Sequence, residues 1–126
     1  LADAVRASLK MSGMERTDVR HIISGANGGP SDVDEAEGLG KAIAHGATVV
    51  SLKGYIGEGF GASSILSSIA GAISISKGVF PKDSGYVTGR PGWGWARAGS
   101  EGVPESCLVT ACGPSREAGA LILRKV

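Results

Sequence analysis

Residues 47–77 read ATVVSLKGYIGEGFGASSILSSIAGAISISK. A short β-branched run opens this stretch and predicts a strand over 47–52. A turn rich in glycine follows and carries Lys53 and Glu58. Small and branched apolar residues then predict a helix over 61–77. Lys53 and Glu58 are therefore expected on a tight turn between a strand and a helix, where the backbone N–H groups of the first helical turn are unpaired.

The predicted helix over 61–77 has two different faces. Its apolar face consists of Ile65, Leu66, Ile69, Ala70 and Ile73, which recur at helical spacing. The remaining positions are mostly serine, alanine and glycine, whereas a solvated helix normally carries lysine and glutamate there. This pattern predicts a helix packed on both sides, which requires more protein than 126 residues supply.

Length and composition restrict the class of protein. A chain of 126 residues has room for one domain with a modest core. Glycine accounts for 21 residues without a regular period, which excludes a collagen-like structure, and the apolar share of 42% argues against disorder. Thirteen basic and twelve acidic residues give a net charge of +1 with no long run of either sign, so neither a nucleic acid nor a membrane partner is expected.

The two cysteines and the ends of the chain bear on its cellular setting. Cys107 and Cys112 lie five residues apart in one predicted strand, so their side chains are expected on opposite faces, without a local disulfide or a shared metal ion. Reduced, buried cysteines and a cytoplasmic location are expected. No signal peptide is recognised, and the apolar helix is too short to span a bilayer. The chain begins without methionine inside a predicted helix, which predicts a piece of a longer protein.

The whole chain reads as alternating helices and strands. Helices are predicted over 1–12, 32–45 and 61–77, and strands over 20–24, 47–52, 106–112 and 119–125. Ser31 is expected to cap the second helix, whose first turn is acidic. Residues 78–105 are irregular, which in a compact domain indicates a functional loop, an interface or partial disorder. This order implies a mixed sheet with helices packed on it.

Several common site motifs are absent from the sequence. Gly57, Gly59 and Gly61 lack the spacing of a dinucleotide-binding loop, and there is no P-loop. His21 is expected to be structural, and His45 is expected at a helix end, where the helix dipole favours it. Neither histidine has metal-site spacing, and no nucleophile elbow of a serine hydrolase occurs. The sequence therefore predicts neither a cofactor nor a metal ion.

Four stretches occur in an order typical of one enzyme family. They are IISGANG at 22–28 before an acidic helix, SLKGYIGE at 51–58, KGVFP at 77–81 and CGPSR at 112–116. In this order they resemble the C-terminal half of a β-ketoacyl synthase, an enzyme of the thiolase fold, almost from end to end. The resemblance implies an α/β thiolase-like half-domain over residues 1–126, part of a longer chain, with a mixed β-sheet, layered helices and a buried small-residue helix.

The same resemblance indicates which catalytic groups have changed. Condensing enzymes of the family use a cysteine from the N-terminal half and two histidines, which donate hydrogen bonds to the thioester carbonyl as enolate charge develops. Ala26 stands at the first histidine position and Glu58 at the second, and only Lys53 remains in register. Alanine has no donor, and an ionised glutamate only accepts hydrogen bonds. The gating phenylalanines are also missing, with Cys112 and Pro114 near their places. A decarboxylating condensation is therefore not expected.

Three functions remain open on these residues. The first is a non-condensing partner of the chain-length-factor type in polyketide or fatty-acid biosynthesis, which contributes a dimer interface and pocket shape. The second is an acyltransferase with altered chemistry, in which Glu58 is a general base with a raised pKa. Lys53 would oppose that rise, and a structural Lys53–Glu58 ion pair is the simpler assignment. The third is a free-standing module that binds an acyl group or a carrier protein.

The resemblance also implies partners for the chain. They are an acyl carrier protein, the missing N-terminal half, and a second subunit in a homodimer or in a heterodimer with a ketosynthase. RPGWGWAR at 90–97 combines aromatic residues with arginines, which are enriched at interface hot spots; the tryptophans form an interface or fold back on the core. Arg116 either meets a carrier protein or a phosphopantetheine phosphate, or is an ordinary surface residue. The acyl substrate and the pathway are not determined by the sequence.

Overall fold

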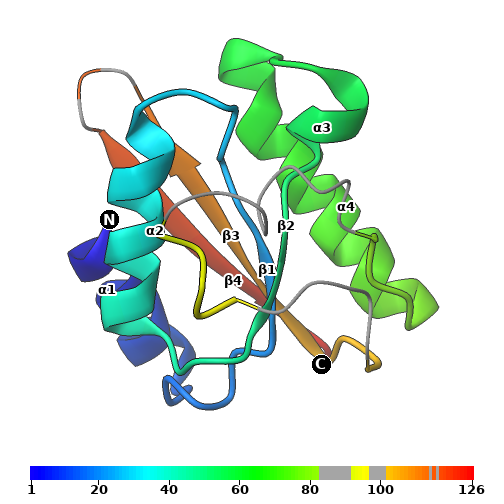
Figure 1. The fold of residues 1–126 in the computed structure, drawn as a ribbon. Helices are drawn as coiled ribbons and strands as arrows, with labels where there is room; N and C mark the ends of the chain where they lie inside the picture. The colour runs from blue at the N-terminus through cyan, green and yellow to red at the C-terminus, as the bar shows by residue number, and fades with distance from the viewer. Residues whose placement is uncertain (83–91, 97–101, 114, 116) are drawn as a thin grey trace.

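The computed structural model describes residues 1–82, 92–96, 102–113, 115 and 117–126. A four-stranded sheet lies in the middle, with α1 and α2 on one side and α4 on the other (Figure 1). The helices are α1 (Ala2–Ser12), α2 (Ser31–Ala42), α3 (Lys53–Ile56) and α4 (Ser63–Lys77), with a 3-10 turn at Phe60–Ala62. The strands are β1 (His21–Ile23), β2 (Thr48–Val50), β3 (Ser106–Cys112) and β4 (Ala118–Arg124). No described helix is long and apolar enough to cross a membrane.

The sheet is mixed, as the sequence predicts. Its strand order is β2-β1-β3-β4. Strand β1 runs parallel to both β2 and β3, and β4 returns antiparallel to β3. The carboxyl ends of the three parallel strands therefore lie at one edge of the sheet, which is where open α/β sheets place their ligand sites.

Two apolar cores lie on the two sides of the sheet. The larger one packs α1 and α2 against the sheet around Val5, Ile22 and Leu39. The smaller one lies on the α4 side around Ile23, Val50 and Val109. All three residues of β1 and of β2 are buried, as expected for parallel strands that are covered on both faces.

Helix α4 packs on the sheet through its small residues. Its buried positions are Ser63, Ser67, Gly71 and Ser74. A Cβ atom at Gly71 would lie 3.1 Å from Leu123 Cδ1, so glycine permits the close approach of helix and sheet. The apolar face is exposed in this chain, with Ile65 at 62% and Ile73 at 55%. The packing of the small-residue face is thus confirmed, and the apolar face is left open.

Two details of α2 differ from the prediction. The helix ends at Ala42, so His45 lies in a turn beyond it and the expected dipole contact is wrong. The chain leaves the helix at Ile43, whose extended backbone places a fully buried side chain in the core. Ser31 does not cap the helix either, because Pro30 holds that position without a side-chain hydrogen bond.

The irregular region after α4 contributes to the core. Phe80 is buried and its ring lies 4.8 Å from that of His21, which fits the structural role expected for this histidine. Trp93 is also buried, and the Trp95 indole N–H donates to the Ala36 carbonyl at 3.1 Å. Both tryptophans therefore fold back on the core and do not form an exposed interface. The arginines at the ends of the 90–97 segment lie outside the described residues.

Candidate functional site

A cavity of about 660 Å³ opens at the carboxyl edge of the sheet. Its walls come from the loop after β1, the turn after β2, the start of α4 and the end of β3. The residues used below are Asn27, Lys53, Glu58, Ser63, Thr110, Cys112 and Glu117. The cavity therefore lies where parallel strands end and a helix begins.

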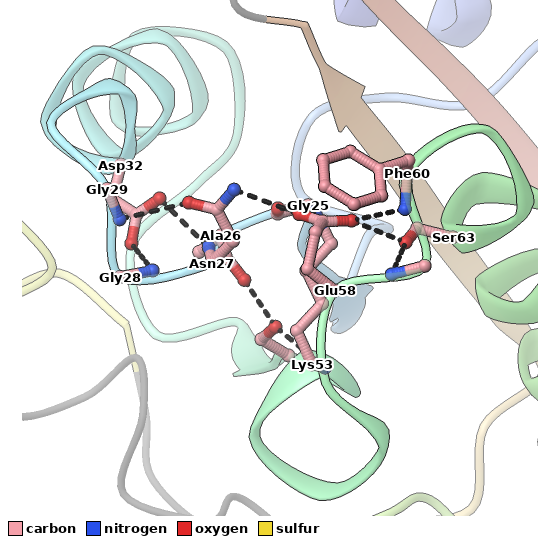
Figure 2. Close-up of polar contacts among 12 residues, drawn as sticks. Gly25, Ala26, Asn27, Gly28, Gly29, Asp32, Lys53, Glu58, Phe60 and Ser63 are labelled. Carbon is pink, nitrogen blue, oxygen red and sulfur yellow. Dashed lines mark hydrogen bonds and ion pairs between the residues drawn. The ribbon is translucent and has the colours of Figure 1, made fainter.

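Lys53 and Glu58 form an ion pair in the wall of this cavity. Lys53 Nζ lies 2.8 Å from Glu58 Oε2 and also donates to the Gly25 carbonyl at 2.7 Å (Figure 2). Lys53 is the first residue of α3, a short helix in the segment that the sequence predicts only as a turn. The side chain of Lys53 is 12% exposed, so its charge depends on these two acceptors. The ion pair predicted from the sequence is confirmed.

The Glu58 carboxylate accepts four hydrogen bonds, two on each oxygen. Oε1 accepts from the Phe60 N–H and from Ser63 Oγ, both at 2.8 Å. Oε2 accepts from Asn27 Nδ2 at 2.9 Å and from Lys53 (Figure 2). Hydrogen bonding to Lys53, and next to Asn27, lowers the pKa of Glu58 to about 2. A general base at Glu58 requires a raised pKa, so the prediction that this pKa is raised is wrong.

The loop after β1 brings Ala26 to the same place. Ala26 is buried; its N–H donates to Ser24 Oγ at 3.0 Å, and its carbonyl accepts from Ser51 Oγ at 2.6 Å. Its neighbour Gly25 accepts from Lys53, so all three positions singled out in the sequence meet at one site (Figure 2). The methyl group of Ala26 packs in the larger core, and it can neither donate nor accept a hydrogen bond.

The buried carboxylate of Glu35 holds this loop through hydrogen bonds, a role that the sequence did not reveal. Its Oε1 accepts from Ser24 Oγ at 2.9 Å, from the Gly25 N–H at 2.9 Å and from Thr110 Oγ1 at 2.6 Å. Burial raises the pKa of Glu35, and these hydrogen bonds oppose that rise. One signal could have found it: Glu35 lies on the same helical face as Leu39, which faces the core.

Two further residues that hold this loop were missed in the sequence. Asn27 joins the loop to the Glu58 turn through its side-chain amide. Asp32, in the first turn of α2, accepts from the backbone N–H groups of Asn27 and Gly28 at 3.0 and 2.8 Å. This carboxylate holds the loop at the helix start, where Ser31 was expected to act. Neither residue carries a sequence motif, since each acts through a contact that the fold creates.

Both cysteines are free thiols, and the structure provides no reactive sulfur here. Cys107 is buried, and Cys112 is half-buried in the cavity wall. Burial raises the pKa of each thiol to about 12. A thiolate is the reactive form of cysteine, so neither side chain is suited to act as a nucleophile. Within the described residues no group of three His, Cys, Asp or Glu side chains is arranged to hold a metal ion.

Both thiols should react slowly with iodoacetamide while the chain is folded. At pH 8, a pKa of about 12 leaves only about one thiol in 10,000 ionised. Labelling followed by mass spectrometry at pH 8 measures the rate at each cysteine. The same chain in urea is the control and should label at both sites within the normal time for a free thiol. Fast labelling of Cys112 in the folded chain would contradict the buried, neutral thiol.

The turn between β3 and β4 closes the cavity on its other side. Glu117 Oε2 accepts from the Ser115 N–H at 3.0 Å, and the Glu117 carbonyl accepts from the Gly113 N–H at 2.8 Å. Two residues singled out in the sequence lie outside the described residues: Arg116, a possible contact of a carrier protein, and Pro114, near the place of a missing gating phenylalanine. Glu117 is therefore the charged side chain that this turn is seen to contribute to the cavity wall.

One family model matches this chain, and solved structures match its fold. The family model "Beta-ketoacyl synthase, C-terminal domain" matches residues 1–86. No curated protein sequence matches the chain. Matching solved structures include "The ishigamide ketosynthase/chain length factor", with a TM-score of 0.80 at 20% identity over 99% of this chain and 32% of that chain.

Two further solved structures match over 99% of this chain. The oxazolomycin ketosynthase domain OzmH KS7 of Streptomyces albus JA3453 has a TM-score of 0.83 at 13% identity, over 26% of its length. A type II polyketide synthase acyl-carrier protein in complex with its ketosynthase (AntDE:AntF) gives 0.82 at 19% identity, over 32% of the matched chain. The chain thus spans about a third or less of the chains it matches, and at this level of identity the likeness shows a shared fold.

Proposed function

Because this chain belongs to the β-ketoacyl synthase family through its C-terminal domain, we propose that it forms part of a non-condensing subunit of the chain-length-factor type in polyketide or fatty-acid biosynthesis. The observation that carries the proposal is the Glu58 carboxylate, held ionised by four hydrogen bonds at the edge of the cavity. Such a subunit shapes an acyl pocket and an interface, and a partner ketosynthase carries out the condensation.

The electrostatics of the site argue against condensation. A decarboxylating condensation develops negative charge on the thioester oxygen, and donors aimed at that oxygen stabilise it. By the family resemblance, Ala26 and Glu58 take the places of the two donating histidines. Alanine donates nothing, and an ionised glutamate with a pKa of about 2 places a like charge beside the developing enolate. Lys53 cannot replace the histidines, because its ammonium group is already held by Glu58 and Gly25.

The open face of α4 supports a larger parent protein. Leu66 and Ile69 are 41% and 51% exposed on the same face as Ile65 and Ile73. A contiguous exposed apolar surface of this kind marks an interaction site. We assign this face to the N-terminal half of the parent chain, with residues 1–126 as its C-terminal thiolase-like domain. A ketosynthase as dimer partner and an acyl carrier protein as the source of acyl groups complete the proposal. Two of the matching structures, a ketosynthase/chain length factor and a ketosynthase in complex with its acyl-carrier protein, are consistent with it.

The intact parent protein should release no carbon dioxide from a malonyl thioester above the uncatalysed rate. The reason is the absence of donors at positions 26 and 58. The measurement is release of labelled carbon dioxide from malonyl-pantetheine, with a condensing ketosynthase as the positive control.

The Glu58→His variant should remain as inactive as the parent, because Ala26 still lacks a donor. Decarboxylation by the parent at the rate of the positive control would overturn the proposed function. If that activity were lost in Glu58→Gln, it would support the acyltransferase with altered chemistry instead.

A further inference from the structure

Hydrogen-bond donors from separate segments of the chain converge on one carboxylate in the cavity. Asn27 Nδ2, from the loop after β1, and Lys53 Nζ, from α3, reach Glu58 Oε2 at 2.9 and 2.8 Å. The Phe60 N–H and Ser63 Oγ, from the start of α4 and the turn before it, both reach Oε1 at 2.8 Å. All of these residues line the cavity. Each oxygen therefore has two donors, as the oxygens of a bound carboxylate ligand would have (Figure 2).

Two of these donors depend on the carboxylate because water reaches little of them. The side chain of Lys53 is 12% exposed, and Ser63 is 9% exposed. Without Glu58, the Lys53 ammonium would keep only the Gly25 carbonyl, and the Ser63 hydroxyl would lose the oxygen to which it donates. A cation and a hydroxyl left unpaired in such a place are unfavourable, so the emptied site would favour another anion.

The backbone at Phe60 adopts a rare conformation beside this carboxylate. Its φ of 47° makes Phe60 the one non-glycine residue with a positive φ in the described part of the chain. This left-handed region is unfavourable for a residue that carries a Cβ atom, and the ring of Phe60 gains little burial there, since the residue is 85% exposed. The conformation does place the Phe60 N–H on Glu58 Oε1. The turn is thus built around the carboxylate.

We propose that the four donors form a carboxylate-binding site in the cavity and that the chain fills this site with Glu58 as a built-in ligand. The carboxylate of another molecule can enter this part of the cavity only where the Glu58 side chain is removed. The site follows from the contacts of Glu58 alone, whereas its place in an acyl pocket rests on the proposed function.

Acetate tests the site in the Glu58→Ala variant of the intact parent protein, in complex with any subunit that copurifies with it. The substitution removes Cγ and the carboxylate of Glu58, and acetate supplies the same atoms. A dissociation constant of about 10 mM is expected, because free acetate loses translational freedom that a tethered side chain has already lost. Exchange of chloride for about 100 mM acetate at constant ionic strength should therefore raise the midpoint of thermal unfolding by roughly 2–4 °C.

Controls show whether the response belongs to this site. Acetamide has the shape of acetate without its charge, so it should leave the midpoint of Glu58→Ala unchanged. The native protein and Glu58→Gln should not respond to acetate, because a side chain of full length still fills the site. Glu37→Ala removes an exposed glutamate of α2, whose ion pair with Lys41 is loose at 3.6 Å, and should not respond either.

A second substitution tests one of the donors. Ser63→Ala combined with Glu58→Ala should weaken acetate binding about tenfold, as expected for one lost hydrogen bond to a charged group. Ser68→Ala in the same background is the matched control, because the hydroxyl of Ser68 donates to the Ser64 carbonyl, and it should leave the acetate affinity unchanged. An unchanged affinity in the Ser63 variant would overturn the assignment of that donor.

Each remaining result supports or overturns the carboxylate site. No shift of the Glu58→Ala midpoint in acetate, or an equal shift in acetamide, would overturn it, as would a shift of the same size in the native protein. If Glu58→Ala does not fold in chloride, the yield of folded protein on refolding in acetate is compared with the yield in acetamide, and equal yields would overturn the site. The proposed function is tested separately, by decarboxylation of the malonyl thioester in the native protein.

Discussion

Replacing Glu35 with alanine should lower the free energy of unfolding by about 3 kcal/mol. The substitution removes the acceptor of three hydrogen bonds, from Ser24, the Gly25 N–H and Thr110. Glu35 is 2% exposed, so water cannot readily replace these bonds, and each buried donor left unpaired costs roughly 1–3 kcal/mol before relaxation. Urea unfolding followed by circular dichroism measures the loss. The loop that carries Ala26 and faces Lys53 should become mobile as a result.

Two variants control for loss of a helix residue and for loss of charge. Glu37→Ala lies on the same helix, where the side chain is 61% exposed and its ion pair with Lys41 is loose at 3.6 Å, so its effect should stay within about 0.5 kcal/mol. Glu35→Gln keeps an acceptor oxygen and should lose less than Glu35→Ala. Equal losses at positions 35 and 37 would contradict the buried role of Glu35.

The Glu35 carboxyl should make the free energy of unfolding depend on pH. Because the pKa of Glu35 is raised in the fold above its ordinary value of 4.5, the folded chain binds more protons than the unfolded chain at pH values above 4.5. This contribution to stability is present below pH 4.5 and is lost as pH rises through the raised pKa. Glu58 acts in the opposite direction, because its pKa is lowered to about 2: its contribution is lost as pH falls from 4.5 toward 2. In the Glu35→Gln variant, the free energy of unfolding should therefore lose its dependence on pH above 4.5 and keep its dependence on pH below 4.5.

Replacing Gly71 with leucine should destabilise the chain by about 3 kcal/mol. Already a Cβ atom at this position would lie 3.1 Å from Leu123 Cδ1 and 3.5 Å from Cys107 Sγ and Val109 Cγ2, so the larger side chain must push α4 away from the sheet. Overpacking of this kind costs about 1–3 kcal/mol or more, which exceeds the gain in helix propensity of about 1 kcal/mol over glycine. Thermal unfolding of the 126-residue chain measures the change.

The next residue along the helix is a matched control. Ala72 is exposed, and Ala72→Leu adds a side chain of the same size without meeting the sheet. We expect the free energy of unfolding of that variant to lie within about 0.5 kcal/mol of that of the parent chain. If both leucine variants lost the same stability, α4 would not pack on the sheet through its small residues.

Local sequence patterns predict much of the fold. The alternation of helices and strands and the mixed sheet follow from periodicity and from the residues that begin and end each element. The pairing of Lys53 with Glu58 also follows, because one turn holds both residues. The end of α2 was missed, because burial of Ile43 in the core overrides the helical pattern that continues beyond Ala42.

The sequence by itself determined the family, the order of the elements and the two unlike faces of α4. Only the tertiary structure decided which face of α4 meets the sheet, that Glu35 accepts from Thr110 75 residues away, and that Asn27 reaches Glu58 across 31 residues. The physical reason is the range of the interactions. Periodicity and turn chemistry act between residues a few positions apart, whereas these contacts exist only once β1, β2 and β3 lie side by side and bring their carboxyl ends together.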